Sequence, residues 1–172
     1  MALIKSVRSY TPKFGKECWL AENSTVVGEV TMGDKCTVWF NAVIRGDVNA
    51  IDIGDRTNVQ DNVTIHGTFE KAATKIGKDV SIGHNAMIHG CTLEDNVLIG
   101  MGAIVMDGAV IKSGSIIAAG AVVLEGTIVE ENSLYAGVPA KKIKDISDKN
   151  AEMITRISGN YIKYASWFKD NE

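Results

Sequence analysis

The sequence is poor in several features that common protein classes require. Its 172 residues include only two prolines and three cysteines, and aromatic residues make up 6%. An odd number of cysteines without paired spacing is typical of reduced, buried thiols in a cytoplasmic protein and not of a disulfide framework. No apolar run is long enough for a signal peptide or a membrane-spanning helix. We therefore expect a cytoplasmic protein that does not associate with membranes.

Clusters of basic residues are also missing. Lysine and arginine number 18 against 21 acidic residues, which gives a formal net charge of −3. No stretch has the basic character of a nucleic-acid-binding surface, so we expect no nucleic-acid partner. The hydrophobic fraction of 45% is enough for a substantial core, and the length suggests one domain with a terminal appendage.

Repeats of six residues occupy most of the chain. From Phe14 to Tyr135, twenty hexads each begin with an apolar residue, and the fifth position, including Val48, is usually small or branched. This period is neither helical nor a simple strand alternation, and it fits a short strand followed by a tight turn. Frequent glycine at the second position suits a corner with a demanding backbone conformation. The pattern predicts an all-β solenoid of six to seven triangular coils with parallel strands, in which the first and fifth positions face inward.

The repeats divide the chain into three segments. Residues 1–13 are expected to form a lead-in, residues 14–142 the β-helix, and residues 143–172 a C-terminal helix packed on the solenoid. Apolar residues recur with helical spacing over Ser147–Phe168, and Ser147 or Asp148 could cap the helix.

The only three histidines fall within residues 66–89, and two of them, His66 and His89, each directly follow the leader of a hexad. If the three faces alternate, Arg45, His66 and His89 form one vertical column at about 4.8 Å per coil. Two imidazoles one coil apart suit a single metal ion. Each histidine could instead simply form a hydrogen bond with the backbone of a turn.

His84 falls in a different column of the repeat. Asp61 lies one coil before His84 in its column, with Gln60 beside it. Outward-pointing side chains on different faces diverge, so a threefold assembly could bring His84 of one subunit to His66 and His89 of the next. Three histidines with an open fourth position are typical of catalytic zinc.

Four segments of the repeat carry distinctive motifs: Ile44–Asp47 (IRGD), Asn58–Asp61 (NVQD), Val63–Gly67 (VTIHG) and Ile82–Gly90 (IGHNAMIHG). These motifs resemble those of the γ-class carbonic anhydrase family, within the hexapeptide-repeat superfamily of left-handed β-helices. The resemblance implies a left-handed parallel β-helix that forms a homotrimer. It implies Zn²⁺, with Fe²⁺ or Co²⁺ as alternatives, bound by His66 and His89 of one subunit and His84 of another. The expected activity is that of a zinc-dependent carbonate dehydratase-like lyase, in which a metal-bound hydroxide reversibly hydrates CO₂ to bicarbonate.

The same resemblance assigns roles to six further residues. It implies that Gln60 orients the hydroxide and that Asn58 lies close to the substrate. Tyr161 is a looser match to an active-site tyrosine, and it could equally be one more residue of an apolar stripe. The remaining three would form an intersubunit network, with Arg45 as a further contact for bicarbonate: Arg45, Asp47 and Asp61.

Two departures separate the chain from the prototype of the class, and it resembles the shorter subgroup without an acidic loop. Val48 stands where the prototype has a glutamate, and the loop after His66 has a single carboxylate, Glu70. Both differences affect the removal of a proton in each turnover. Two alternatives therefore stay open. One is an acyl-CoA-dependent hexapeptide acyltransferase, suggested by the exit sequence GVPAKKI, and the other is a catalytically weak trimeric scaffold that retains a metal.

Overall fold

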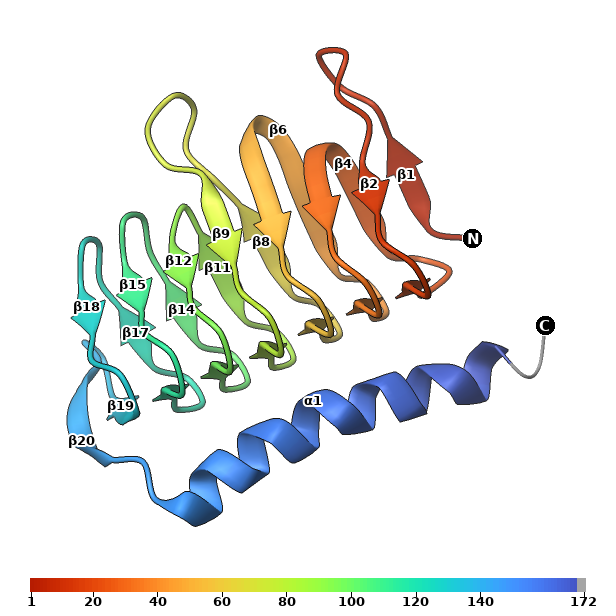
Figure 1. The fold of residues 1–172 in the computed structure, drawn as a ribbon. Coiled ribbons are helices and arrows are strands. Elements are labelled where there is room, and N and C mark those ends of the chain that lie inside the picture. The colour runs from red at the N-terminus through yellow and green to blue at the C-terminus, as the bar shows by residue number, and fades with distance from the viewer. Residues whose placement is uncertain (170–172) are drawn as a thin grey trace.

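A computed structural model describes residues 1–169 of the chain. It is a left-handed parallel β-solenoid of about seven turns, along which one C-terminal helix runs (Figure 1). The strands are β1 (Leu3–Lys5), β2 (Lys13–Phe14), β3 (Trp19–Leu20), β4 (Thr25–Met32), β5 (Thr37–Val38), β6 (Val43–Ile53), β7 (Asn58–Val59), β8 (Thr64–His66), β9 (Thr74–Ile76), β10 (Ser81–Ile82), β11 (Met87–His89), β12 (Thr92–Leu93), β13 (Leu98–Ile99), β14 (Ile104–Val105), β15 (Val110–Ile111), β16 (Ile116–Ile117), β17 (Val122–Val123), β18 (Ile128–Val129), β19 (Ser133–Ala136) and β20 (Lys141–Asp145).

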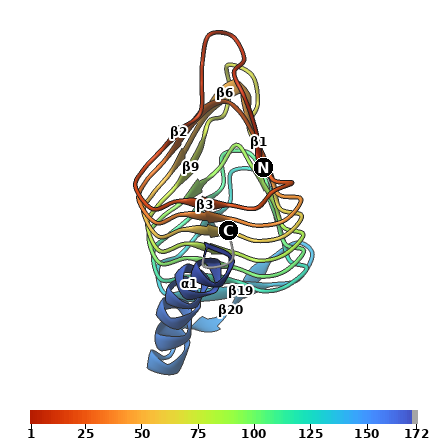
Figure 2. The same cartoon turned by 90° about the vertical axis from the view of Figure 1, so that its right-hand side faces the viewer.

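The coil is triangular in cross-section, and we name its faces A, B and C (Figure 2). Face A carries β1, β8, β11, β14, β17 and the first halves of β4 and β6. Face B carries β2, β9, β12, β15, β18 and the second halves of β4 and β6. Face C carries the remaining strands, ending with β20, which lies antiparallel to β19. The corner at which the chain passes from face C to face A is called the C–A corner below.

The hexad leaders fill the core as the sequence predicts. Leaders such as Ile44, Ile65 and Ile88 are fully buried, and so are most fifth positions. Val48 is an exception, because a three-residue insertion places it in the bend of β6, where it is only half-buried. Ile51 is buried instead.

The demanding backbone conformation lies at the fourth position of the hexad, so the explanation given above for the second-position glycines was wrong. Asparagine, which tolerates left-handed φ values, occupies the fourth position in five hexads, with φ between 51° and 61°: Asn41, Asn62, Asn85, Asn96 and Asn132. In later coils glycine takes this place, as at Gly102. Second-position glycines have ordinary φ values, and they are needed because successive coils approach each other closely there.

Replacement of Gly54 by alanine tests this explanation. The new Cβ would lie 2.6 Å from the carbonyl carbon of Gly77 and 2.8 Å from the amide nitrogen of Lys78, both on the next coil. We expect the free energy of unfolding to fall by about 1–3 kcal/mol, measured by denaturant titration. The control is Gly102→Asn, because a Cβ at Gly102 would meet nothing within 4 Å and asparagine is found at equivalent positions. Equal stability of both variants would contradict the explanation.

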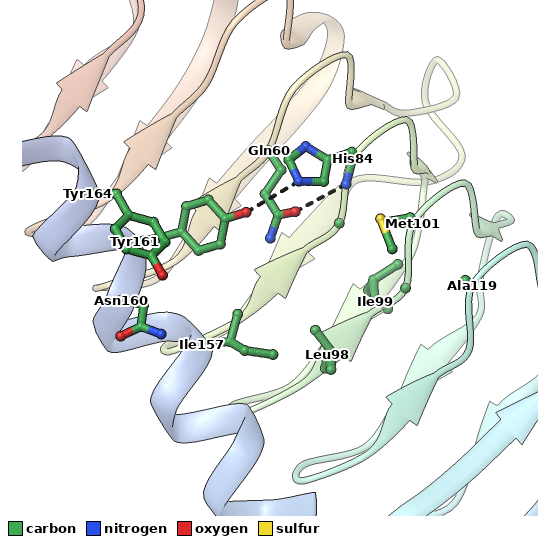
Figure 3. Close-up of a pocket in the computed structure, with 12 residues that line it drawn as sticks. Gln60, His84, Leu98, Ile99, Met101, Ala119, Ile157, Asn160, Tyr161 and Tyr164 are labelled. Atoms are coloured by element: carbon green, nitrogen blue, oxygen red, sulfur yellow. Dashed lines mark hydrogen bonds between the residues drawn. The ribbon is translucent and has the colours of Figure 1, made fainter. Parts of the chain in front are cut away.

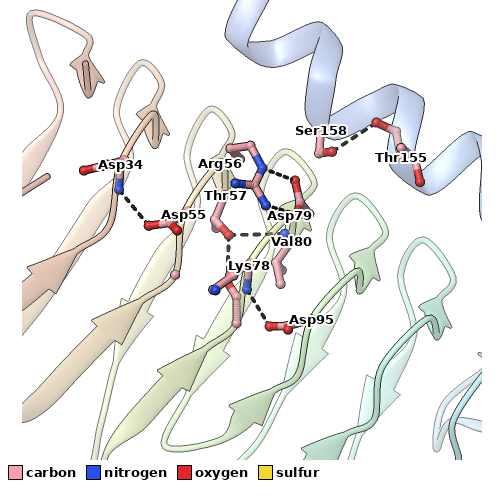
Figure 4. A network of polar contacts seen from close by, with 12 residues as sticks. Asp34, Asp55, Arg56, Thr57, Lys78, Asp79, Val80, Asp95, Thr155 and Ser158 are labelled. Atoms are coloured by element: carbon pink, nitrogen blue, oxygen red, sulfur yellow. Dashed lines mark hydrogen bonds and ion pairs between the residues drawn. The ribbon is translucent and has the colours of Figure 1, made fainter. Parts of the chain in front are cut away.

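Side chains at the corner between faces B and C connect successive coils (Figure 4). The carboxylate of Asp55 accepts a hydrogen bond of 2.9 Å from the amide of Asp34. That of Asp95 accepts one of 2.8 Å from the amide of Lys78. The guanidinium of Arg56 donates two hydrogen bonds to Asp79, of 2.8 and 2.5 Å. The charged residues of this corner therefore have a structural role, because they connect one coil to the next.

The C-terminal helix α1 (Asp148–Lys169) covers face C and contacts β5 and β10. Its predicted cap is confirmed, since the carbonyl of Ser147 accepts the amide of Ala151 at 3.0 Å and its hydroxyl faces Asn150. Its last turn packs on aromatic side chains of the first coils, with the ring of Phe168 5.1 Å from that of Trp19. The last three residues of the predicted C-terminal segment lie outside the described residues. Among residues 1–169, no helix has both the length and the apolar character needed to span a membrane.

Candidate metal centre

Two histidines lie side by side on face A. Strands β8 and β11 are parallel neighbours, and their register pairs His66 directly with His89. Each follows a buried isoleucine at the end of its strand, so its ring points away from the core. The Nδ1 atom of His66 lies 3.2 Å from the Nε2 atom of His89. The vertical column predicted from the repeat is therefore present for these two residues.

Each of the two imidazole rings has an inner nitrogen, which faces the other histidine, and an outer nitrogen, which faces an aspartate. The Nε2 atom of His66 lies 3.0 Å from Oδ1 of Asp47, and the Nδ1 atom of His89 lies 2.5 Å from Oδ1 of Asp107. Histidines that bind metals usually donate their second ring N–H to a carboxylate in this way. Burial raises the pKa of both aspartates, but hydrogen bonds lower it overall, from Arg45 and His66 to Asp47 and from Thr68 and His89 to Asp107. Both carboxylates therefore remain ionised as acceptors.

These tautomers place two imidazole lone pairs opposite each other. When the outer nitrogens of His66 and His89 donate to the aspartates, the inner nitrogens carry no proton while both rings are neutral. Burial lowers the pKa of His66, which favours its neutral form. Tetrahedral zinc with Zn–N bonds of 2.0–2.1 Å separates two ligand nitrogens by about 3.3 Å. The observed separation of 3.2 Å and the donor chemistry therefore fit a shared cation.

His84 lies elsewhere, at the C–A corner after β10 (Figure 3). Its Nδ1 atom is 2.7 Å from Oδ2 of Asp61, one coil earlier, so the predicted column of these two residues is also present. Its Nε2 atom lies 3.4 Å from the hydroxyl of Tyr161 on α1. All three histidines thus have a carboxylate on one ring nitrogen. Within residues 1–169, however, no three histidine, cysteine, aspartate or glutamate side chains converge on one metal position.

Gln60 is held beside His84 by a short series of hydrogen bonds. Its Oε1 atom accepts the backbone N–H of His84 at 3.2 Å, and its Nε2 atom donates to Oδ1 of Asn58 at 3.0 Å. Asn58 in turn donates to the hydroxyl of Ser81 at 2.8 Å. Because Asn58 and Gln60 are both buried, this series fixes the orientation of the Gln60 amide.

Arg45 lies one coil before His66, directly after the paired residues Ile44 and Ile65, as the repeat predicts. Its Nη1 atom is 2.5 Å from Oδ2 of Asp47, and Asp47 therefore connects Arg45 to His66. Val48 and Glu70 line a small pocket of about 150 Å³ next to Asp47. That pocket also includes the carboxylate of Glu29, which the sequence interpretation did not identify.

Two hollows adjoin the histidines. One, of about 390 Å³, lies between α1 and face C and brings Gln60, His84 and Tyr161 to the same largely apolar cavity (Figure 3). The other, of about 480 Å³, surrounds His89 on face A and contains Asp107. Exposed apolar side chains gather around this second hollow: Met87, Ile104 and Met106. Clustered exposed apolar groups of this kind mark interaction surfaces.

Asp107 is the site residue that the sequence interpretation missed. It is the third residue of the hexad led by Val105, one coil after His89 on the same face, so the repeat offered a signal. Asp107→Asn should lower the metal affinity about tenfold, because asparagine accepts the His89 N–H without a negative charge. Titration with Zn²⁺ would measure the loss. Glu125→Gln is the control, because Glu125 lines the same hollow and pairs with Lys71 instead of a histidine. Equal affinities of both variants and the unmodified protein would contradict this role.

The family model for bacterial transferase hexapeptide repeats matches residues 73–105 and 90–125. A Methanocaldococcus jannaschii protein named "Probable carbonic anhydrase" is 51% identical over 86% of this chain and 92% of its own length. The Escherichia coli protein YrdA is 39% identical, with coverages of 98% and 95%. Gamma carbonic anhydrase 2 of Arabidopsis thaliana is 35% identical over 94% of this chain and 60% of its own length.

The structural comparison agrees with the sequence relatives. A hexapeptide transferase family protein from Anaplasma phagocytophilum superposes with a TM-score of 0.93 at 36% identity, and the match covers 96% of this chain and 98% of that one. The relatives, the repeat and the motifs around the histidines lead to one conclusion: the chain belongs to the γ-class carbonic anhydrase-like family of hexapeptide-repeat β-helix proteins.

Proposed function

We propose that this protein is a metal-dependent hydratase that interconverts CO₂ and bicarbonate at sites shared between the subunits of a homotrimer. The observation that carries the proposal is the pair of inner imidazole nitrogens of His66 and His89, 3.2 Å apart, with a carboxylate on the outer nitrogen of each ring. When the outer nitrogens hold the protons and both rings are neutral, the two inner lone pairs repel each other unless a cation lies between them. The names of the relatives from M. jannaschii and A. thaliana support the same activity.

The third ligand in this proposal is His84 of the partner subunit. Because α1 covers face C, a neighbour can approach His84 only at the C–A corner. The exposed apolar group around His89, which includes Met87 and Met106, would supply the contact area on the opposing face A. A closed ring of three such contacts satisfies every subunit, as heterologous interfaces require.

The metal would be held by His66 and His89 of one subunit and His84 of another, and Zn²⁺, Fe²⁺ and Co²⁺ all accept such donors. When bound, such an ion acts as a Lewis acid and lowers the pKa of a water ligand to about 7. Asp47, Asp61 and Asp107 fix the ring orientations and keep one nitrogen of each histidine available.

Polar groups at the C–A corner would position the reacting water and CO₂. The Gln60 amide, oriented by Asn58, offers a hydrogen bond to the water, while its Oε1 atom accepts the backbone N–H of His84. Tyr161 extends a hydroxyl toward the same place from α1. Arg45 could contact bicarbonate on the face A side of the site, where Asp47 holds it.

The proposal is tested with the purified full-length protein. We expect one metal ion per subunit by elemental analysis, and CO₂ hydration by stopped flow that is lost on chelation and restored by Zn²⁺, Fe²⁺ or Co²⁺. The absence of stoichiometric metal, or metal-loaded protein no faster than buffer, would contradict it.

One alternative function has support of its own. The Anaplasma neighbour is described as a hexapeptide transferase, and the cavity of about 390 Å³ beside α1 is larger than CO₂ needs. An acyl-CoA-dependent acyltransferase would use His84 as a lone general base and would require no metal. Acetyl transfer from acetyl-CoA that survives chelation, without CO₂ hydration, would favour this alternative. A metal-binding scaffold would show neither activity.

A further inference from the structure

Two of the three cysteines lie on successive coils at the N-terminal end of the solenoid. Cys18 and Cys36 are both fifth residues of their hexads, at the corner between faces B and C. They immediately precede β3 and β5, whose register pairs Trp19 with Thr37. The amide of Trp19 donates to the carbonyl of Cys36 at 3.0 Å. This arrangement places the two cysteines opposite each other in adjacent coils.

Their separation suits a covalent link. Adjacent parallel strands lie about 4.8 Å apart, and this spacing falls within the Cα separation of 4.4–6.8 Å found in disulfides. Each thiol donates to a carbonyl of the following coil at 3.1 Å, Cys18 to Gly33 and Cys36 to Gly54. Cys91 lies at a different corner, between β11 and β12.

The two thiols differ in access and in acidity. Cys18 is half-buried, whereas Cys36 is fully buried. The neighbouring Cys36 thiol lowers the pKa of Cys18 to about 7, whereas the proximity of Cys18 and burial raise the pKa of Cys36. The accessible thiol is therefore the better nucleophile, and the buried thiol is placed to react second.

We propose that Cys18 and Cys36 form a reversible disulfide with low-molecular-weight disulfides as the oxidant. In the first step the Cys18 thiolate attacks one sulfur of oxidised glutathione, which forms a mixed disulfide and releases one glutathione thiolate. The Cys36 thiol then loses its proton and attacks the Cys18 sulfur, which releases the second glutathione. The net reaction oxidises two protein thiols and reduces one glutathione disulfide to two thiols.

This bond would fasten the first coil of the solenoid to the second. The first coil has a neighbour on one side only, and stability in a solenoid is a sum of coil–coil interfaces. The same coil also receives the end of α1, since Nζ of Lys169 donates to the carbonyl of Glu17 at 3.1 Å and the Trp19 ring packs on Phe168. Oxidation should therefore raise the melting temperature by about 5–10 °C, as expected for the loop that the Cys18–Cys36 bond would close. The inference is independent of the proposed activity.

The test is mass spectrometry of the full-length protein after incubation with oxidised glutathione and alkylation of the remaining thiols. The unmodified protein and Cys91→Ser should each show a linked Cys18–Cys36 peptide that dithiothreitol separates, together with the rise in melting temperature. Cys36→Ser should retain glutathione on Cys18, and Cys18→Ser should form no internal disulfide. Three alkylated thiols in the unmodified protein, glutathione on Cys18 without a disulfide, or a bond to Cys91 would each overturn the proposal.

Discussion

Replacing His84 by alanine should abolish stoichiometric metal binding and CO₂ hydration while the chain keeps its solenoid fold. The imidazole of His84 is partly exposed at the C–A corner, where its ring nitrogens face Asp61 and Tyr161. Its loss therefore leaves the core unchanged. Two histidines alone bind zinc far more weakly than three, because each further ligand adds coordination energy and helps to complete the tetrahedral geometry. Elemental analysis would measure the loss of metal, stopped-flow kinetics the loss of CO₂ hydration, and sedimentation the state of assembly.

Metal and assembly should respond together in this variant. A metal shared between subunits stabilises the trimer by mass action, so its loss should also raise the subunit concentration needed for assembly. The control is Asn85→Gly, one residue further along the same corner, because glycine accepts the left-handed φ of 61° found there. Full metal occupancy in His84→Ala would show that His66 and His89 bind the ion without a partner subunit.

Gln60→Ala should lower CO₂ hydration about 100-fold without loss of metal, because in the proposed mechanism the side chain acts on the reacting water and not as a ligand. Its amide is held between the backbone N–H of His84 and the Asn58 carboxamide, so its orientation is set before substrate arrives. Alanine removes the group and leaves the His84 N–H without its acceptor. A loss of stability of about 1–3 kcal/mol should accompany the change. Hydration rates are therefore compared at a temperature at which both proteins remain folded.

Asn160→Ala is the matched control for Gln60. Asn160 lines the same cavity from α1, so its replacement alters the cavity wall but leaves the Gln60–Asn58 series intact. We expect its hydration rate to remain close to that of the unmodified protein. Equal rates for Gln60→Ala and the unmodified protein would contradict the role assigned to Gln60. A metal-loaded protein without any hydration to lose would favour the scaffold alternative.

The six-residue period made the columns predictable because it allows only discrete positions. Once three hexads close a coil, any two residues at the same hexad position and face must stack, and His66 and His89 do so in the structure. The same reasoning correctly placed Asp61 beneath His84. The resemblance in motif then gave these columns a chemical meaning that spacing alone left open.

Other features depend on side-chain conformations and tertiary packing that a repeat does not encode. Asp107 reaches His89 from a neighbouring hexad position one coil away, which requires particular rotamers of both residues. The position of Tyr161 depends on how α1 lies along face C, and no local motif specifies that packing. The glycines were misinterpreted because a close approach between coils and a left-handed φ favour the same residue for different physical reasons.

The most direct test of a metal site shared between subunits is the metal content of mixed trimers. Two chains with different affinity tags, one carrying His84→Ala and the other His89→Ala, are expressed together, and neither binds metal alone. In a ring of three subunits, each mixed trimer regains one complete interface, so about a third of the sites should bind metal in mixed trimers isolated with both tags. Metal and hydration at that level would support the account. Mixed trimers that remain free of metal would contradict it, because the restored interface should have brought His66 and His89 of one chain to His84 of the other.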